Sequence, residues 1–247
     1  MLKILHLYYD LMNLYGDWAN TEMLARELEA RGCQAAIDRK SAGDDVDFGS
    51  YSFIHIGSGT ERSLRACMSD LARSRDAFIT CIESGMHVLM TGNSHELLGR
   101  AVTGPGGDRF EALGLLDFET VAENSRVTGD CVCEVPFLQD KLIGFINRAG
   151  HGQDGEIDRP FRMQLGPGAN DHSTVEGVLY KNVLGTYMTG PILVRNPPLL
   201  RYFADLLCPD HASQRVADEP LFAAQEAAYR MALSELTARI GQPGQKP

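Results

Sequence analysis

Residues 87–99 of this chain read HVLMTGNSHELLG. The short, mostly apolar run suits a buried strand, Gly92 suits a turn, and the Glu-Leu-Leu that follows suits the start of a helix. Residues 51–60 repeat this order, because an apolar run ends in Gly-Ser-Gly-Thr and a helical pattern follows. Alternation of strand, turn and helix predicts a parallel sheet covered by helices on both faces.

The same alternation extends over roughly the first 100 residues. Apolar periodicity predicts strands at residues 2–8, 33–38, 51–56 and 87–90, and helices at residues 18–31, 61–71, 74–84 and from 95 onward.

The second half of the chain changes character, since predicted strands follow one another with short connections. We predict strands at residues 118–121, 126–135 and 142–147, a polar Gly-rich loop at 148–158, a hairpin over 175–187 around Lys181-Asn182, and helices at 196–207 and 218–240. The expected fold class is α/β, with a mostly parallel sheet flanked by helices and additional antiparallel strands in the second half. We expect one domain over residues 1–240 and a disordered tail over residues 241–247.

The composition is that of an ordinary globular protein, with 44% hydrophobic residues and a net charge of −10. This charge argues against a nucleic-acid partner, because phosphate binding needs a basic surface. No apolar run approaches the roughly 20 residues of a spanning helix, and the N-terminus does not resemble a signal peptide, so we expect no membrane span and a cytoplasmic location. The six cysteines form no CxxC pair, so we expect reduced, structural thiols and neither a metal site nor a cofactor.

A series of short segments carries a more specific signal. In chain order they are DLMNLYGD at 10–17 with Asn20, IGSGT at 56–60, ELLG at 96–99, LGLLD at 113–117, Arg126 with Gly129-Asp130, GFIN at 144–147, and GTYMTGP at 185–191 with Asn196-Pro197. Together they resemble the cobyric-acid-synthase-like branch of the class I glutamine amidotransferases. Within that branch the chain is most similar to the glutaminase subunits of lipid II isoglutaminyl synthases. The resemblance implies the flavodoxin-like fold of class I glutamine amidotransferases.

The chemistry implied by this resemblance needs a cysteine that attacks the glutamine side chain and a histidine that transfers the proton. The family's elbow reads Cys-Gly-Gly-aromatic-Gln-Leu-Leu-Gly, which places Gly92 at the nucleophile position. The family's histidine lies in Gly-Thr-Tyr-Leu-His-Gly-Pro, which places Thr189 at the base position. Glycine carries no nucleophile and threonine is no base near neutral pH, so glutamine hydrolysis by this mechanism is expected to be negligible.

Other parts of the implied site are present. Arg126 matches the family's glutamine-binding arginine, and Asp17 matches an aspartate that is assigned as a third catalytic position. The glycine loop beside the oxyanion site is matched by Gly57, Ser58 and Gly59.

The residues just after the elbow each have two interpretations. Ser94 is a helix-capping serine or a replacement nucleophile, and we favour the cap. Asn93 fills space that a substrate would use, or caps the helix. His95 lines the pocket or lies on the helix surface. Other reactive side chains are interpreted as structural or solvated rather than catalytic: Cys81, His151 and His172.

Two functions fit these features. The first is a non-catalytic glutaminase-like subunit that acts as scaffold or regulator of a Mur-ligase-like synthetase, the partner that the resemblance implies for amidation of a cell-wall precursor. The second is a pocket reused to bind or transform a glutamine- or glutamate-like small molecule, surrounded by Arg126, Ser94, His95, Glu96 and Thr189. An active glutaminase stays an alternative if the alignment slips. The apolar stripe of helix 218–240 packs on its own domain or contacts a partner.

Overall fold

A six-stranded sheet forms the centre of the fold in this computed structural model, which describes residues 1–153, 155, 157–211 and 220–241. Five of its strands are parallel, in the order β12-β4-β3-β1-β2, and β11 adds antiparallel at the edge beside β12. The strands are β1 (Leu2–Leu7), β2 (Ala35–Lys40), β3 (Phe53–Ile56), β4 (His87–Thr91), β11 (Val178–Tyr180) and β12 (Val183–Thr186). The predicted mostly parallel α/β sheet is thus confirmed.

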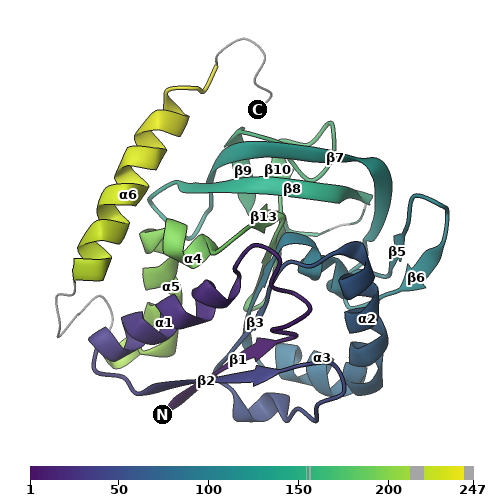
Figure 1. The fold of residues 1–247 in the computed structure, drawn as a ribbon, viewed down its shortest axis with the longest axis horizontal. Coiled ribbons are helices and arrows are strands. Elements are labelled where there is room, and N and C mark those ends of the chain that lie inside the picture. Colours follow the sequence, from purple (N-terminus) through teal and green to yellow (C-terminus); the bar gives the residue numbers. More distant parts are fainter. Residues whose placement is uncertain (154, 156, 212–219, 242–247) are drawn as a thin grey trace.

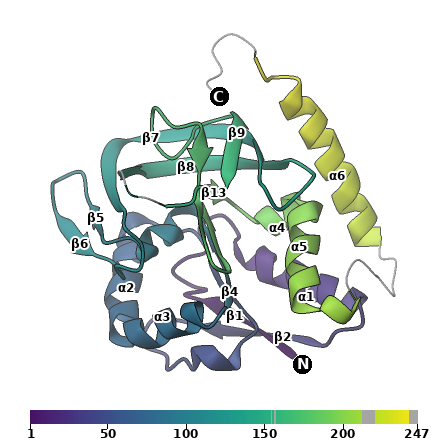
Figure 2. The ribbon, with the colours of Figure 1, turned by 180° about the vertical axis from the view of Figure 1, so that it is seen from behind.

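Helices cover both faces of this sheet, as Figures 1 and 2 show. One face packs against α1 (Trp18–Ala30), α4 (Ile192–Arg195) and α5 (Pro197–Leu207), and the other against α2 (Glu61–Leu71) and α3 (Arg75–Glu83). Side chains alternate along a strand, so Phe53 belongs to the first core and its neighbour Ile54 to the second. Both are fully buried, and burying such side chains stabilises the fold by roughly 2 kcal/mol each.

A second, mainly antiparallel sheet follows in the chain, and Figure 1 shows its long strands lying above the parallel sheet. It comprises β5 (Ala101–Thr103), β6 (Arg109–Glu111), β7 (Glu119–Glu134), β8 (Leu142–Gln153), β9 (Phe161–Leu165), β10 (Val175–Glu176) and β13 (Met188–Thr189). The last helix, α6 (Pro220–Thr237), packs Tyr229 and Leu233 against Val132 and Ile143 of this sheet. Packing on its own chain, the simpler interpretation of this helix, therefore holds for that face.

Several boundaries differ from the prediction. The strands predicted at 118–121 and 126–135 form one strand, β7, with a register irregularity between Ala122 and Val127. The loop predicted from residue 148 is wrong as far as Gln153, because residues 148–153 pair with β7 and extend β8. The predicted hairpin exists as β11 and β12, but Gly177, with φ +82°, turns the preceding residues into β10 of the other sheet.

The helix predicted from residue 95 is also wrong. Residues 92–98 form only a 3₁₀ helix, η3 (Gly92–Leu98), and the chain then enters β5. The carbonyl oxygens of Leu97 and Leu98, which a longer helix would use, accept the backbone N–H groups of Leu113 and Leu115 instead. Three further 3₁₀ turns occupy Phe48–Ser50, Ala72–Ser74 and Pro209–His211.

Cysteine pairing corrects a second expectation. Cys33, just after α1, and Cys208, just after α5, form a disulfide across 175 residues of sequence, whereas the composition suggested reduced thiols throughout. The other four cysteines are free and buried, as expected. Of the predicted tail only Gly241 lies within the described residues, and residues 218 and 219 of the last predicted helix lie outside them.

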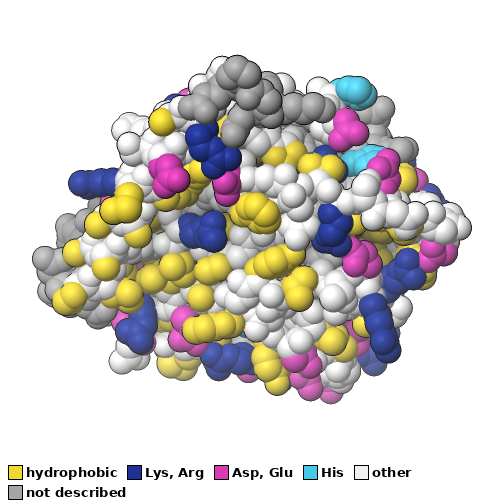
Figure 3. Space-filling view, turned by 45° about the horizontal axis from the view of Figure 1, so that its top comes forward, with side chains coloured by type: hydrophobic (Ala, Val, Ile, Leu, Met, Phe, Trp, Pro, Cys, Tyr) yellow, Lys and Arg dark blue, Asp and Glu magenta, His cyan; other side chains and the backbone are white. Residues whose placement is uncertain are grey.

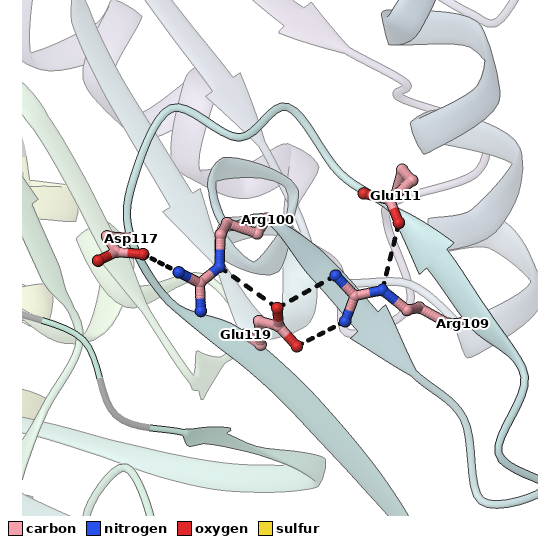
Figure 4. Close-up of polar contacts among 5 residues, drawn as sticks. All are labelled: Arg100, Arg109, Glu111, Asp117 and Glu119. Atoms are coloured by element: carbon pink, nitrogen blue, oxygen red, sulfur yellow. Dashed lines mark hydrogen bonds and ion pairs between the residues drawn. The ribbon is translucent and has the colours of Figure 1, made fainter.

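The surface carries charges of both signs. On the face in Figure 3 the basic and acidic side chains are interspersed with hydrophobic ones. Figure 4 shows one such group at the edge of the second sheet, where Arg100 contacts Asp117 and Glu119, and Arg109 contacts Glu119 and Glu111. Among the helices of the described residues, none has the length and hydrophobicity to cross a membrane.

Candidate active site

The elbow position lies at the carboxyl end of β4, where η3 begins at Gly92. Gly92 has a φ of +62°, the left-handed conformation of a sharp strand-to-helix turn. The turn geometry that exposes a nucleophile is therefore present without the nucleophile.

The space beside Gly92 is occupied. A Cβ atom at this position would lie 2.3 Å from the Cβ of Ser58 and 3.2 Å from its Cα. Ser58 is held there because its hydroxyl donates to the Asp17 carboxylate at 2.7 Å. Thr91 donates to the other oxygen of Asp17 at 2.8 Å, and all three side chains are buried. A cysteine at position 92 thus needs the Ser58 backbone to move.

A backbone N–H donor of the glycine loop is also bonded to a protein acceptor. The N–H of Gly59 donates to the Asn93 side-chain oxygen at 3.0 Å. Asn93 lines the cavity beside the elbow. Of the two interpretations of Asn93, the structure favours filling of substrate space, since its oxygen takes a donor that an oxyanion would otherwise use.

The matched arginine is bound to protein partners. Arg126 Nη1 donates to Glu61 at 2.7 Å, and its Nε donates to the Asn147 side-chain oxygen at 2.6 Å. Asn147 in turn donates to the hydroxyl of Tyr15 at 2.7 Å. Desolvation opposes ionisation of Glu61, but its own backbone N–H and Arg126 outweigh that effect and lower the pKa of this carboxyl. A substrate carboxylate would have to compete with Glu61 for the guanidinium.

Thr189 lines the same cavity as Arg126, Asn93 and Ser58, so segments that are far apart in the sequence meet in space. The Thr189 hydroxyl donates its hydrogen bond to the Phe145 carbonyl at 3.0 Å and therefore does not donate to Asp17. We call this cavity the Gly92 pocket. Its open volume is about 40 Å³, enough for a few water molecules and far below the roughly 300 Å³ of a small-molecule site.

Ser94 and His95 do not line the Gly92 pocket. The Ser94 hydroxyl lies 2.9 Å from the Ile56 carbonyl and 2.8 Å from the Thr91 carbonyl, so its role is structural. The favoured interpretation as a helix cap is wrong, because Ser94 lies inside η3 and its hydroxyl donates to a carbonyl instead of accepting a backbone N–H. His95 bonds the Gly92 carbonyl through Nδ1 and packs edge-on against Tyr187. Burial lowers the pKa of His95 to about 3, so its ring is neutral at physiological pH.

Glu96, which sequence reasoning placed around the pocket, lines it, but its buried neighbours Tyr187 and Arg148 were missed. Glu96 accepts a hydrogen bond from the Tyr187 hydroxyl at 3.0 Å, and burial raises the pKa of its carboxyl to about 8. The guanidinium carbon of Arg148 lies over the Tyr187 ring, 5.7 Å from the ring centroid. The sequence does contain a signal for Arg148. It lies two residues after Ile146 on the same strand, so both side chains point to the same, buried face of β8.

The remaining candidates fall outside the site. Cys81 is buried in α3, and burial raises the pKa of its thiol. His151 belongs to β8 rather than to a loop and lies 3.8 Å from exposed Glu123. His172 lies in an exposed turn. Within the described residues, Asp17 is not grouped with enough His, Cys, Asp or Glu side chains to form a metal-binding cluster.

Comparison with known proteins agrees with the arrangement of these segments. The model of the CobB/CobQ-like glutamine amidotransferase domain matches residues 3–197. Among curated proteins, subunit GatD of lipid II isoglutaminyl synthase (glutamine-hydrolyzing) from Staphylococcus aureus is 30% identical over 207 residues, covering 84% of each chain. The protein of the same name from Streptococcus pneumoniae is 32% identical over 233 residues, covering 88% of this chain and 90% of its own.

Solved structures support the same fold. A crystal structure titled glutamine amidotransferase is 18% identical, with a TM-score of 0.54, and covers 82% of this chain and 98% of its own. A glutamine amidotransferase from Thermotoga maritima is 11% identical, with a TM-score of 0.53, and covers 96% of each chain. The predicted class I fold is confirmed. The chain belongs to the CobB/CobQ-like glutamine amidotransferase family.

Proposed function

We propose that this chain is a glutaminase-like subunit that no longer hydrolyses glutamine and that acts as a scaffold or regulator of a Mur-ligase-like synthetase. One observation carries the loss of activity: Gly92 occupies the nucleophile position, and Ser58 fills the space where a side chain would project. Loss of the nucleophile or base of such a unit typically lowers the rate by about 10⁴- to 10⁶-fold.

Three other contacts support this proposal. Thr189 stands at the base position with its hydroxyl bonded to a backbone carbonyl. The Gly59 N–H and the Arg126 guanidinium already have protein acceptors in Asn93 and Glu61. These two groups are therefore satisfied from within, so a ligand that binds them must break existing bonds.

The relatives are named as subunits of lipid II isoglutaminyl synthase, which supports the proposal of a partner subunit. A protein that keeps a docking surface while losing its chemistry would retain this fold and much of its sequence. The expected setting is a cytoplasmic complex with an ATP-dependent ligase of the Mur type. The test is affinity purification of the tagged chain from its native cells. Stoichiometric recovery of such a ligase supports the proposal, and its absence under gentle conditions counts against the scaffold role.

The second candidate is a pocket that binds a glutamine- or glutamate-like ligand. Arg126 on the wall of the Gly92 pocket favours it, because a guanidinium can bind a carboxylate through two hydrogen bonds. Titration calorimetry with glutamine, glutamate and a glutamyl dipeptide tests this candidate, with Arg126→Met as the matched variant. Heat that saturates in the unmodified chain and disappears in R126M would support binding. The small volume of the pocket leads us to expect no saturable heat.

A further inference from the structure

The disulfide between Cys33 and Cys208 joins the ends of two helices that lie side by side in Figures 1 and 2. Cys33 follows α1 and Cys208 follows α5, and both helices contribute to the same hydrophobic core. The bond closes a loop across 175 residues of sequence. Neither cysteine lines the Gly92 pocket, so the bond has a role separate from that site.

Hydrogen bonds fix the backbone of Cys33 without help from the disulfide. Gly32, with a φ of +84°, ends α1 in the left-handed conformation, and the N–H of Cys33 donates to the Leu28 carbonyl at 2.9 Å. The N–H of Gly32 donates to the Glu29 carbonyl at 2.8 Å, which completes a Schellman motif. Cys33 therefore has a defined position whether or not its sulfur is bonded.

The backbone of Cys208 is also held by hydrogen bonds. Its N–H donates to the Ala204 carbonyl at 2.9 Å, and its own carbonyl accepts the N–H of His211 at 3.1 Å. The Cys208 residue is 5% exposed and belongs to the core that α1 and α5 share. Reduction of the disulfide leaves these contacts in place.

A buried arginine holds the two helix ends together. Arg31, whose side chain is 1% exposed, donates through Nε to Glu27 of α1 at 2.9 Å. Its Nη1 donates to Asp205 of α5 at 2.5 Å. Separation of the helix ends would leave a buried charge without its partner, so these contacts oppose it. The two cysteines thus stay close after reduction, and closure of the bond is an intramolecular reaction at high effective concentration.

The cysteines differ in their access to small reagents. Cys33 is half-buried, so this is the end of the bond that a small thiol reaches. Burial raises the pKa of each of the four free thiols, which belong to Cys67, Cys81, Cys131 and Cys133. The thiolate is the form that exchanges with disulfides, so buried thiols of raised pKa react slowly. Exchange is therefore confined to the bonded pair.

We propose that Cys33 and Cys208 form a redox-sensitive tether, which small thiols open and small disulfides such as oxidised glutathione close, without unfolding of the chain. In opening, a thiolate attacks the Cys33 sulfur, the bond to Cys208 breaks, and the Cys208 thiolate takes a proton from water. A second thiol then displaces the first from Cys33. The protein gains two electrons and two protons, and the reagent leaves as its own disulfide. Closure reverses these steps.

This role rests on the proposed function only for the cytoplasmic setting, where permanent disulfides are rare and reversible ones act in redox sensing. Oxidising conditions then raise the stability of the chain, because a bond across so long a loop restricts the unfolded state. The test measures thiols and unfolding, so its outcome is independent of glutamine hydrolysis and of a ligase partner.

The experiment equilibrates the full chain in glutathione buffers of different redox ratio, without denaturant, and then blocks free thiols with N-ethylmaleimide. Mass spectrometry of the peptides is expected to show that Cys33 and Cys208 gain the label together in reducing buffer. Both should lose it after return to oxidised glutathione, with an unchanged far-UV circular dichroism spectrum throughout. Thiols that stay free in oxidised glutathione, or a pair that resists reduction until the chain unfolds, overturn the proposal.

Urea titration measures the effect of the tether on stability. The midpoint of unfolding of the unmodified chain is expected to be at least about 0.5 M higher in oxidising than in reducing buffer. Cys33→Ser should abolish this difference, whereas Cys81→Ser, the matched change at a free, buried cysteine of α3, should keep it. If C33S fails to fold, Cys208→Ser and the labelling of the unmodified chain still decide. A difference that persists in the serine variant of the pair, or that is absent from the unmodified chain, contradicts the tether.

Discussion

Two cavities meet at Arg148 and differ in how much space they leave open. In the Gly92 pocket the hydroxyl of Ser58, the side chain of Asn93 and the guanidinium of Arg126 are bonded to protein groups, and about 40 Å³ of open volume remains. The second cavity is lined by Gly129 of β7 and by the loop after β9, and about 400 Å³ of it is open. The three groups of the Gly92 pocket must give up protein partners before they can bind a ligand. The inherited family position is thus the more closed of the two.

The largest effect is expected from adding a side chain to the closed site. Gly92→Ala places a Cβ 2.3 Å from that of Ser58 at a φ of +62°, so we expect the free energy of unfolding to fall by about 2–4 kcal/mol in urea titration. Gly107→Ala is the matched control, because Gly107 has a φ of +82° and open space around its Cβ position. It should cost only the backbone part, about 1 kcal/mol. Equal losses in the two variants would mean that Ser58 does not fill the pocket.

The contribution of Glu96, which lines the Gly92 pocket, to stability is expected to depend on pH. Burial raises the pKa of Glu96 to about 8, above the roughly 4.3 of an unfolded chain. The folded protein therefore keeps a proton that the unfolded chain releases, and this contribution to stability is complete below about pH 4 and is lost as pH rises through 8. Between pH 6 and pH 8 the unmodified chain should lose about 2 kcal/mol more than Glu96→Gln in urea titrations. Glu235→Gln controls for loss of one exposed carboxylate. Parallel curves for the unmodified chain and E96Q would contradict the buried, protonated carboxyl.

The smallest effect is expected at Arg148, whose Nε and Nη2 have no hydrogen-bond acceptor among the described residues. Replacing Arg148 by Met removes a buried charge together with its bond to Gly150, and such replacements are often neutral or stabilising. We expect the free energy of unfolding of R148M to stay within about 1 kcal/mol of the unmodified chain or to exceed it. A loss of about 3 kcal/mol or more in urea titration would show that Nε and Nη2 have partners in solution.

The positions of the closed site could be predicted from sequence, because Gly92 and Thr189 lie in short segments whose order and spacing fix their place at strand ends. The filling of the pocket by Ser58 could not, since it depends on the path of a loop held by Asp17, 41 residues away. The same holds for the larger cavity at Arg148, whose walls come from β7, β8, the end of β9 with the loop that follows it, and Arg239 after α6.

The fold likewise has parts that the sequence predicts and parts that it does not. The parallel sheet was predictable because its buried strands are continuous apolar runs bounded by glycine. The extension of β8 through residues 148–153 was not, because those residues are polar or small and take their strand conformation from pairing with β7. The short η3 was misread as a longer helix because its carbonyl acceptors are taken by a distant loop.

Ammonia release from glutamine tests the central claim most directly. The purified chain, alone and with its ligase partner, is incubated with glutamine, and ammonia is measured against buffer and against an active glutaminase of the family. We predict release no faster than in buffer, because Gly92 offers no nucleophile and Ser58 fills its place. Sustained release over many turnovers that disappears in R126M would contradict the account, since it would require catalysis by this pocket.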